Sequence, residues 1–320
     1  GILLNLDTED DRELTIGCAG GIDITATGKF EAEPTNQGLS AFSITLKGLT
    51  GGHSGMDIHK GRGNANKLMN RVLATLAENT NALIHSIDGG GLRNAIPRES
   101  VSIVCVEPSQ VDNLLKTISE LETIFREEYR VTDPHLKLAA EPVATPETVL
   151  QTAFQEKLLK AVYACPNGIY RMSPDIAGLV QTSNNVARVL VQNGSFSILC
   201  LTRSAVDTEK MDLATAIRAA FELMGAAVSH GGSYPGWTPK PDATIVKLMR
   251  EIYKELYQDE PHVNACHAGL ECGIIGRNYP GMEMISFGPN IHGAHSPDEK
   301  VQISSVKKFW TFLLETLQRV

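Results

Sequence analysis

The sequence predicts an α/β protein built in two parts, with an α/β domain formed by both ends of the chain and an inserted α+β domain between them. Three observations lead to this prediction. The chain has 320 residues, which exceeds the usual length of a domain built around a single hydrophobic core. Between residues 41 and 140, strand and helix patterns follow each other in the order β-α-β-β-α-β. The glycine-rich segment 18–21 and the segment 234–239, with two prolines, interrupt these patterns as domain boundaries do.

The composition limits the kinds of partner that the protein can have. A net charge of −8 leaves no basic surface for nucleic acid or an anionic membrane. No apolar run reaches the ~18 residues that span a bilayer, and no signal-peptide pattern is present. Six cysteines are scattered without a C-x-x-C pair, which disfavours a disulfide scaffold and favours a reducing compartment. We therefore expect a cytoplasmic protein.

The inserted domain, placed at residues 21–234, contains two sets of elements. The first set follows the ferredoxin-like plan, with a strand at 41–49, a helix at 64–77, strands at 82–87 and 100–106, a helix at 110–129 and a strand at 135–140. The second begins with a helix, and comprises a helix at 147–163, strands at 176–192 and 195–202, a helix at 208–224 and a strand at 225–230. Asn193-Gly194 suits a type I′ hairpin turn between two of these strands. Two ferredoxin-like halves could share one sheet.

The two ends of the chain, 1–20 and 235–320, form the other domain in this prediction. Its elements are strands at 2–7 and 13–18, a helix at 242–257, a loop around 266–271, a strand at 282–287, a loop at 288–299 and a helix at 302–319. The first strand has no preceding methionine or other element. We therefore expect that the sequence starts in the middle of a fold, because the chain is either truncated or a fragment.

Polar residues at the ends of two apolar strands are candidate metal ligands. Asp7 ends the first strand, while His292 and His295 lie in the loop after the strand at 282–287. Functional residues of open α/β sheets gather at such carboxyl ends, and zinc takes imidazole nitrogen and carboxylate oxygen. The alternatives are a turn-capping aspartate and ordinary surface histidines. Asp7 with a loop histidine could form half of a zinc site.

Three further segments carry candidate binding residues. His53 is flanked by glycines in the loop 51–59, so its ring should be exposed unless the loop is only a structural turn. Three glycines precede Arg93-Asn94, so this loop can present the side chains of Arg93 and Asn94 to a ligand. Arg203 follows the apolar run 196–201 and suits bidentate binding of a carboxylate, although a surface ion pair is the more common use.

Eight segments share motifs with one family, in the family's order from end to end of the chain. They are NLDTE (5–9), GCAGGID (17–23), LKGLTGGHSG (46–55), GRGNANKL (61–68), LRNAIPRE (92–99), YPGW (234–237), HAGLECG (267–273) and AHSPDE (294–299). Together they resemble the M20 metallopeptidase family, and most closely its cytosolic members that cleave Xaa-His dipeptides such as carnosine. Each motif is weak alone, but the ordered set is specific.

The resemblance implies a zinc-peptidase catalytic domain at 1–20 and 235–320, with an inserted lid that makes a homodimer. Asp7 and His295 would each bind one of two zinc ions. His53 would be catalytic, reaching into the partner subunit's site to help hold the oxyanion. Asn94, Arg203 and Gly269 would bind the dipeptide, with Arg203 at its terminal carboxylate. The resemblance assigns no role to His292 or Glu271. In the complete enzyme a zinc-bound water would attack the peptide carbonyl while a glutamate takes its proton.

The sequence also departs from the family pattern. The family's His-x-Asp motif, bridging Asp and Glu-Glu pair precede the strand that ends at Asp7, and the chain has no residues there. Its Glu127-Glu128 pair falls within an amphipathic helix instead. We therefore expect this chain alone to bind zinc weakly and to hydrolyse nothing. Two alternatives stay open: another M20 amidohydrolase, such as a tripeptidase or acylase, which the long lid disfavours, or a non-enzymatic lid and dimerisation fragment.

Overall fold

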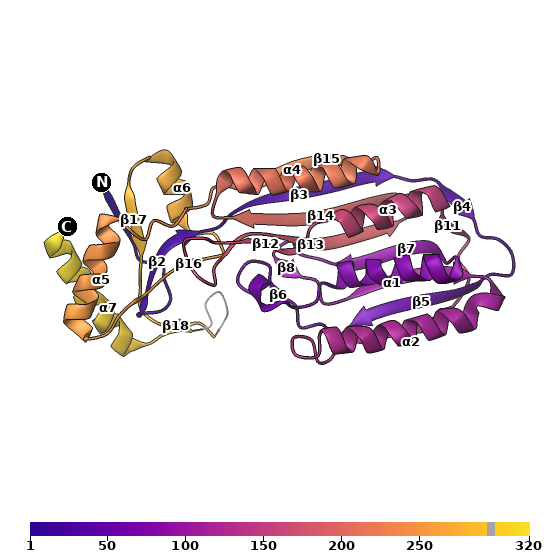
Figure 1. Cartoon of the computed structure of the whole chain (residues 1–320), viewed down its shortest axis with the longest axis horizontal. Coiled ribbons are helices and arrows are strands. Elements are labelled where there is room, and N and C mark those ends of the chain that lie inside the picture. Colours follow the sequence, from indigo (N-terminus) through magenta and orange to yellow (C-terminus); the bar gives the residue numbers. More distant parts are fainter. Residues whose placement is uncertain (293–297) are drawn as a thin grey trace.

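The computed structural model describes residues 1–292 and 298–320. The molecule is elongated, with a large sheet at one end and a small sheet at the other (Figure 1). The large sheet has nine strands and the small one has four. Within the described parts of the chain, no helix is long and apolar enough to cross a bilayer.

The first half of the large sheet has the predicted ferredoxin-like order. Its elements are β5 (Ser40–Lys47), α1 (Ala65–Thr80), β7 (Leu83–Gly90), β9 (Ser100–Val106), α2 (Val111–Glu128) and β10 (Lys137–Val143). The strands lie in the order β10-β5-β9-β7 and are antiparallel throughout. Alternate residues of β5, Phe42, Ile44 and Leu46, are buried, as their spacing predicts.

The second half has the same plan, but its first strand comes earlier in the chain than the sequence analysis placed it. Its elements are β3 (Gly20–Lys29), α3 (Thr152–Ala164), β13 (Val180–Gln192), β14 (Ser195–Ser204), α4 (Asp207–Leu223) and β15 (Ala227–Tyr234). These strands lie in the order β13-β14-β3-β15. The expectation that this half begins with a helix is therefore wrong, because the whole first half is inserted between β3 and α3. Ile22, Ile24 and Ala26 of β3 are buried at every second position.

The two halves meet where β7 pairs with β13. Gly90 lies opposite Arg188, and Ile87 lies opposite Val191. Beyond this seam β13 runs into the hairpin with β14. Asn193 and Gly194 have φ angles of 51° and 69°, which confirms the type I′ turn.

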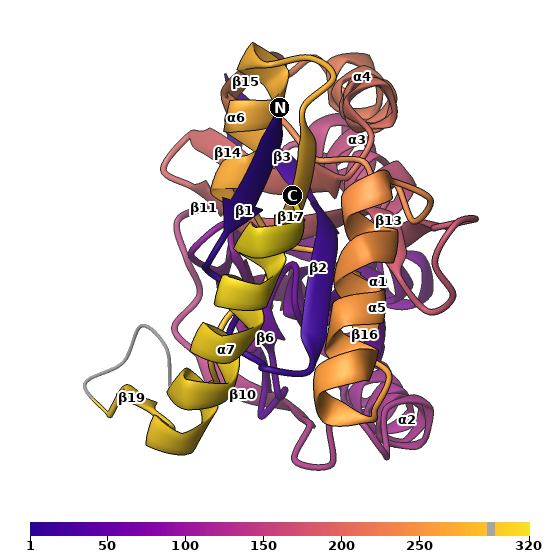
Figure 2. The ribbon, with the colours of Figure 1, turned by 90° about the vertical axis from the view of Figure 1, so that its left-hand side faces the viewer.

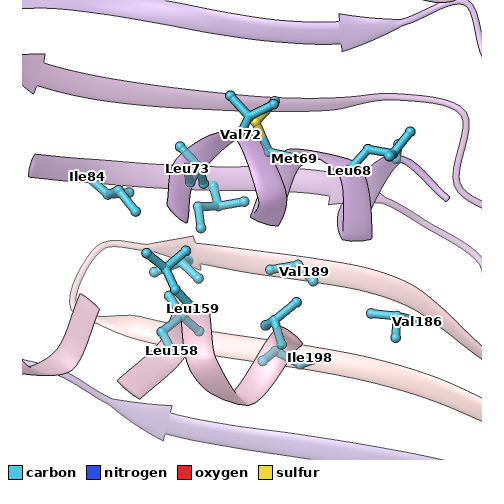
Figure 3. Close-up of a cluster of buried hydrophobic side chains, with 14 of the residues drawn as sticks. Leu68, Met69, Val72, Leu73, Ile84, Leu158, Leu159, Val186, Val189 and Ile198 are labelled. Carbon is cyan, nitrogen blue, oxygen red and sulfur yellow. The ribbon is translucent and has the colours of Figure 1, made fainter. Parts of the chain in front are cut away.

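One hydrophobic core lies between the large sheet and its four helices. Helix α1 contacts α2 and α3, and α3 contacts α4, so the helices form one layer (Figure 1). Figure 3 shows the centre of this core, where side chains of α1 and α3 meet those of the strands beneath. The buried residues there include Leu68, Met69, Val72, Leu73, Ile84, Leu158, Leu159, Val186, Val189 and Ile198.

The small sheet carries helices on both faces. Its strands are β1 (Ile2–Asn5), β2 (Glu13–Cys18), β16 (His262–Cys266) and β17 (Glu283–Ser286), in the order β1-β17-β2-β16. Ile285 packs in the cluster with α5 (Thr244–Tyr257) and α7 (Ile303–Arg319), whereas its neighbour Met284 packs with Trp237 and Cys272. Cys272 belongs to α6 (Glu271–Asn278).

The predicted loop around 266–271 is present, but it lies between two elements that the sequence did not predict, β16 and α6. Strand β16 is a five-residue edge strand in which no residue is fully buried, so its short alternation of Val263 and Ala265 with polar residues gives a weak strand signal. Helix α6 contains Gly273 and Gly276, which have low helix propensity. Packing requires Gly273, because an added Cβ there would lie 2.5 Å from the Pro235 carbonyl oxygen.

Short elements complete the fold. They are β4 (Ala32–Pro34), β6 (Gly52–His53), β8 (Ala95–Ile96), β11 (Thr148–Leu150), β12 (Gly168–Met172), β18 (Ile291–His292), β19 (Lys300–Val301) and two 3-10 turns (Ile58–Lys60 and Pro108–Gln110). The chain passes from the small sheet to the large one between Cys18 and Gly20 and returns after Tyr234. Cys18 and Trp237 exchange backbone hydrogen bonds of 2.9 Å at this crossing. We keep the division at residues 20/21 and 234/235 as a proposal.

Candidate substrate-binding site

His53 is held by its own loop with one ring nitrogen occupied. Its backbone N–H donates to Asp57 Oδ2 at 2.8 Å, and ring Nδ1 accepts from the N–H groups of Gly55 and Met56 at 3.1 and 3.0 Å. The ring proton is therefore assigned to Nε2. Burial, followed by the charge of Arg203, lowers the pKa of His53 below its ordinary value. At neutral pH the ring is uncharged and Nε2 is a hydrogen-bond donor.

Asn94 lies in the turn before β8, and Arg93 holds this turn against the large sheet. Arg93 Nη1 donates to the carbonyl oxygens of Ile24 and Cys200, each at 3.0 Å. The carbonyl oxygen of Asn94 accepts from the Ser54 N–H at 2.8 Å, which ties this turn to the His53 loop. Arg93 thus has a structural role, whereas the neighbouring Asn94 is exposed.

Arg203 lies near the end of β14 and is only 5% exposed. Its Nη1 donates to Tyr234 Oη at 2.9 Å, while its buried Nε has no hydrogen-bond partner. No ion pair to a carboxylate was found for it among residues 1–292 and 298–320. A surface ion pair, the alternative that the sequence left open, is therefore wrong for Arg203. A buried cation in this state is costly unless an anion joins it.

His267 is buried beside Arg203, although no role is predicted for it from the sequence. Its Nε2 lies 2.7 Å from Ser183 Oγ, and Ser183 is opposite Arg203 in the β13–β14 register. Burial and then the charge of Arg203 lower the pKa of His267 to about 3. The imidazole is consequently neutral at physiological pH and adds no positive charge beside Arg203.

Two glycines bring these residues close together. An added Cβ at Gly55 would lie 2.2 Å from the His267 carbonyl oxygen and 3.2 Å from Arg203 Nε. An added Cβ at Gly269 would lie 3.1 Å from the ring of Tyr234, the partner of Arg203. The loop that carries His53 therefore touches the loop after β16, at the end of the large sheet nearest the small one (Figure 1).

Two hollows adjoin this cluster. One, of about 480 Å³, is lined by His53, Asn94 and the loop 90–99. The other, of about 300 Å³, is lined by Gly55, His267 and residues of the segment 176–180. A hollow of about 730 Å³ lies farther away, against α6 and the segment 235–243, and none of the predicted site residues lines it. The structure thus brings His53, Asn94, Arg203 and Gly269 to one region.

The carboxyl edge of the small sheet gathers the other set of predicted residues. Strands β1 and β17 are parallel, so the loops that follow them leave from the same edge. The Phe287 N–H donates to the Asn5 carbonyl oxygen at 3.0 Å, and the Ile291 N–H donates to that of Glu9 at 3.0 Å. The loop after β17 therefore lies against the loop that contains Asp7.

The candidate ligands occupy different places along this edge. Asp7 is exposed just after β1, and His292 is exposed in β18. His295 falls in the segment 293–297 and lies outside the described residues. Glu271 opens α6, whose Cys272 packs with Trp237 and Met284. Among the described residues, no three or more His, Cys, Asp or Glu side chains form a group that could hold a metal ion.

Comparison with known proteins settles the family. The profile of a family described as the peptidase dimerisation domain matches residues 44–133. The cytosol non-specific dipeptidase of Escherichia coli (strain K12) is 40% identical over 319 residues, which are 100% of this chain and 66% of that protein. The chain belongs to the M20 peptidase family.

A solved structure of this family has the same fold as the chain. The crystal structure of aminoacylhistidine dipeptidase from Vibrio alginolyticus is 40% identical and matches with a TM-score of 0.96, covering 100% of this chain and 65% of that one. The M20 chain therefore spans just under two thirds of the length of both relatives.

Two residues of the M20 chain's site escaped prediction. His267 follows β16, a strand that the apolar pattern did not reveal, and Tyr234 ends β15 in a segment interpreted only as a linker. Both fall within motifs shared with the family, HAGLECG and YPGW. Their burial against Arg203 depends on tertiary packing, so the motifs were the only available signal.

Acid should destabilise the M20 chain through His267. The pKa of this residue is about 3 in the folded chain and 6.5 for an ordinary histidine. Between these values the unfolded chain binds a proton that the folded chain does not, so lowering the pH favours unfolding. From pH 7 to pH 5 the loss is about 2 kcal/mol. Urea denaturation at both pH values should show most of this difference disappearing in His267→Asn. An unchanged pH dependence in that variant would contradict the assignment.

Proposed function

We propose that this chain forms the substrate-binding and dimer-forming part of a metal-dependent dipeptidase that acts on Xaa-His dipeptides such as carnosine. The supporting observation is Arg203, a buried guanidinium whose Nε has no partner. The names of the two similar proteins, a non-specific dipeptidase and an aminoacylhistidine dipeptidase, agree with such a substrate.

Arg203 would bind the terminal carboxylate of the dipeptide. Tyr234 Oη already accepts from one end of its guanidinium, which leaves Nε and Nη2 for a carboxylate. His267 is neutral beside it and so does not compete for the anion. Gly269 leaves room next to the Tyr234 ring, where a side chain would approach it within 3.1 Å. This set of groups favours a small substrate with a free carboxyl end.

His53 and Asn94 would act on the peptide bond of the same substrate. Both line one hollow, and the neutral His53 ring has its proton on Nε2. A neutral N–H can donate to the substrate carbonyl oxygen and bind it more strongly as negative charge develops there. The exposed Asn94 amide could hold the substrate backbone. Action of His53 in the partner subunit's site stays a prediction from the family resemblance.

Zinc belongs to this proposal only for a longer protein. Asp7 supplies one carboxylate at the edge of the small sheet, and His295 lies outside the described residues. Since the described residues form no group of three or more ligands, they do not by themselves fit a zinc centre. The steps above accordingly involve only protein side chains. The match of residues 44–133 to a dimerisation domain supports a homodimer, and the name of the Escherichia coli relative supports a cytoplasmic location.

A fusion protein tests the proposal. The part of the Escherichia coli dipeptidase that has no counterpart here would be joined to this chain in the order that the relative has. We expect the zinc-loaded fusion to hydrolyse carnosine at least ten times faster than the 320-residue chain alone, which should show no activity above a metal-free control. Carnosine hydrolysis by the chain alone would contradict the division of roles proposed here.

The same fusion separates the alternatives. Faster hydrolysis of N-acyl amino acids or tripeptides than of dipeptides would favour another M20 amidohydrolase. A folded, dimeric fusion that binds zinc and cleaves none of these substrates would favour a lid and dimerisation module. Light scattering coupled to size exclusion would establish the dimer independently of activity.

A further inference from the structure

Strands β6 and β8 join the two loops that carry His53 and Asn94 into one ribbon. His53 pairs with Ala95, and the Ser54 N–H donates to the Asn94 carbonyl oxygen at 2.8 Å. The ribbon lies at the end of the large sheet that faces the small sheet (Figure 1), and Figure 2, viewed from the small-sheet end, shows β6 behind that sheet. Two isolated strands are only marginally stable in water, and these have two residues each, so the ribbon needs support from the rest of the fold.

Asn185 of β13 supplies this support from below the ribbon. It is 1% exposed, and its amide nitrogen donates to the carbonyl oxygens of Arg93 and Ala95 at 3.1 and 2.8 Å. These two carbonyl groups belong to the residues on either side of Asn94. One buried amide therefore holds the turn by its backbone on both sides of the exposed Asn94.

Asn64 fixes the orientation of the Asn185 amide. It is the N-cap of α1, where its Oδ1 accepts from the N–H groups of Asn66 and Lys67 at 3.0 and 3.2 Å. Its amide nitrogen consequently faces β13 and donates to Asn185 Oδ1 at 3.2 Å. The reverse orientation of the Asn185 amide would set its oxygen against two carbonyl oxygens, so its nitrogen is directed at the turn.

The strand pair that carries Asn185 also carries Arg203. In the β13–β14 register Asn185 is opposite Leu201, and Ser183 is opposite Arg203. Both side chains therefore belong to neighbouring positions of one hydrogen-bonded ladder, whose spacing the sheet fixes. Because Asn185 holds the turn of Asn94 on this ladder, the distance from Asn94 to Arg203 is set by the sheet and not by the loop.

We propose that Asn185 is a positioning residue, which holds Asn94 at a fixed distance from Arg203 through the two carbonyl groups beside Asn94. The inference rests on the proposed function, in which Asn94 holds the substrate backbone and Arg203 binds the substrate carboxylate. Asn185 does not line the hollow that His53 and Asn94 line. It acts through Asn94 and does not touch the substrate.

A double-mutant cycle in the zinc-loaded fusion tests this role. Asn185→Asp keeps the shape of the side chain and the acceptor for Asn64, but it removes both amide donors. We expect it to lower kcat/KM for carnosine at least tenfold in the parent fusion. In an Asn94→Ala fusion it should lower kcat/KM less than threefold, because the group that Asn185 positions is already gone. Equal factors in the two backgrounds would mean that Asn185 only supports the fold, and would overturn the proposal.

Asn184 provides the matched control. It is the preceding buried residue of β13, and its side chain points to the opposite face of the sheet. Its amide nitrogen donates to the Pro166 carbonyl oxygen at 2.7 Å, and its Oδ1 accepts from Thr202 Oγ1 at 3.0 Å. Asn184→Asp loses a comparable contact away from the ribbon and should leave kcat/KM within threefold of the parent. A loss as large as that of Asn185→Asp would count against a specific role.

Hydrogen exchange in the 320-residue chain tests the same contact without any activity. The Ser54 amide, which bonds the Asn94 carbonyl oxygen, should exchange at least tenfold faster in Asn185→Asp than in the parent or in Asn184→Asp. If the aspartate prevents folding, Asn185→Ser removes the amide without adding a charge and should give the same result. An inactive parent fusion would contradict the proposed function alone, whereas unchanged Ser54 exchange would overturn the role of Asn185.

Discussion

Replacing Arg203 with methionine should lower kcat/KM for a dipeptide by about 10²- to 10⁴-fold in the assembled enzyme. In the proposed function Arg203 binds the substrate carboxylate, so the variant loses a buried, charge-assisted pair, and breaking such a pair costs about 3–5 kcal/mol. Methionine retains the bulk of the side chain among its buried neighbours while removing every donor. Arg203→Lys should recover part of the loss, since lysine keeps the charge but cannot bind in a bidentate manner.

The choice of substrate makes this prediction specific. A dipeptide amide lacks the terminal negative charge, so Arg203→Met should change its hydrolysis much less than that of the free acid. Arg218→Met is the surface control, because Arg218 is exposed on α4 and pairs with Glu222. Equal losses for the acid and the amide would mean that Arg203 supports the structure and does not recognise the carboxylate.

Alanine at Gly90 should lower the free energy of unfolding of the isolated chain by about 3 kcal/mol. Gly90 has a φ of +73°, which costs a residue with a Cβ about 1–2 kcal/mol. The added Cβ would also lie 2.0 Å from the Ala187 carbonyl oxygen, so the seam between β7 and β13 would have to move. That movement would strain two hydrogen bonds. One runs from the Gly91 N–H to the Ala187 carbonyl oxygen, and the other from Arg188 Nη1 to the Gly90 carbonyl oxygen.

The neighbouring glycine supplies the control for this second prediction. Nothing lies within 4 Å of a Cβ added at Gly91, so Gly91→Ala should change stability by less than about 0.5 kcal/mol. Urea denaturation followed by circular dichroism would compare the two variants with the parent chain. Similar midpoints for Gly90→Ala and Gly91→Ala would show that the seam is not held as tightly as described.

Most elements of the large sheet and its helices could be predicted because their patterns are local. Strand β5 alternates Phe42, Ile44 and Leu46, and the turn at Asn193-Gly194 has a sequence that fits few other conformations. Strand β3 has the same alternation, but Gly20-Gly21 at its start was interpreted as a break between domains. These glycines are required by close packing, since a Cβ at Gly20 would lie 2.4 Å from the Gly236 nitrogen.

Most residues of the site could be predicted individually, but not their arrangement. His53 and Asn94 lie in motifs shared with the family, whereas Arg203 was singled out by its place after the apolar run 196–201. The gathering of the three at one end of the large sheet follows from a strand order that no single segment encodes. The contact of His267 with Ser183 depends on the pairing of β13 with β14 and on the docking of β16 nearby. The local sequence around His267 does not contain that information.

Because the first half is inserted between β3 and α3, β3 is synthesised long before the strands that pair with it. Lys29 of β3 pairs with Ser195 of β14, and the two are 166 positions apart (195 − 29). At about 5–20 residues per second, a ribosome needs roughly 8 to 33 seconds to make the intervening chain. During that interval β5, α1, β7, β9, α2 and β10 can fold, while the apolar face of β3 has neither of its neighbours. The nascent chain is therefore most exposed to misassembly through Ile22, Ile24 and Ala26 before the partner strand β14 has been made.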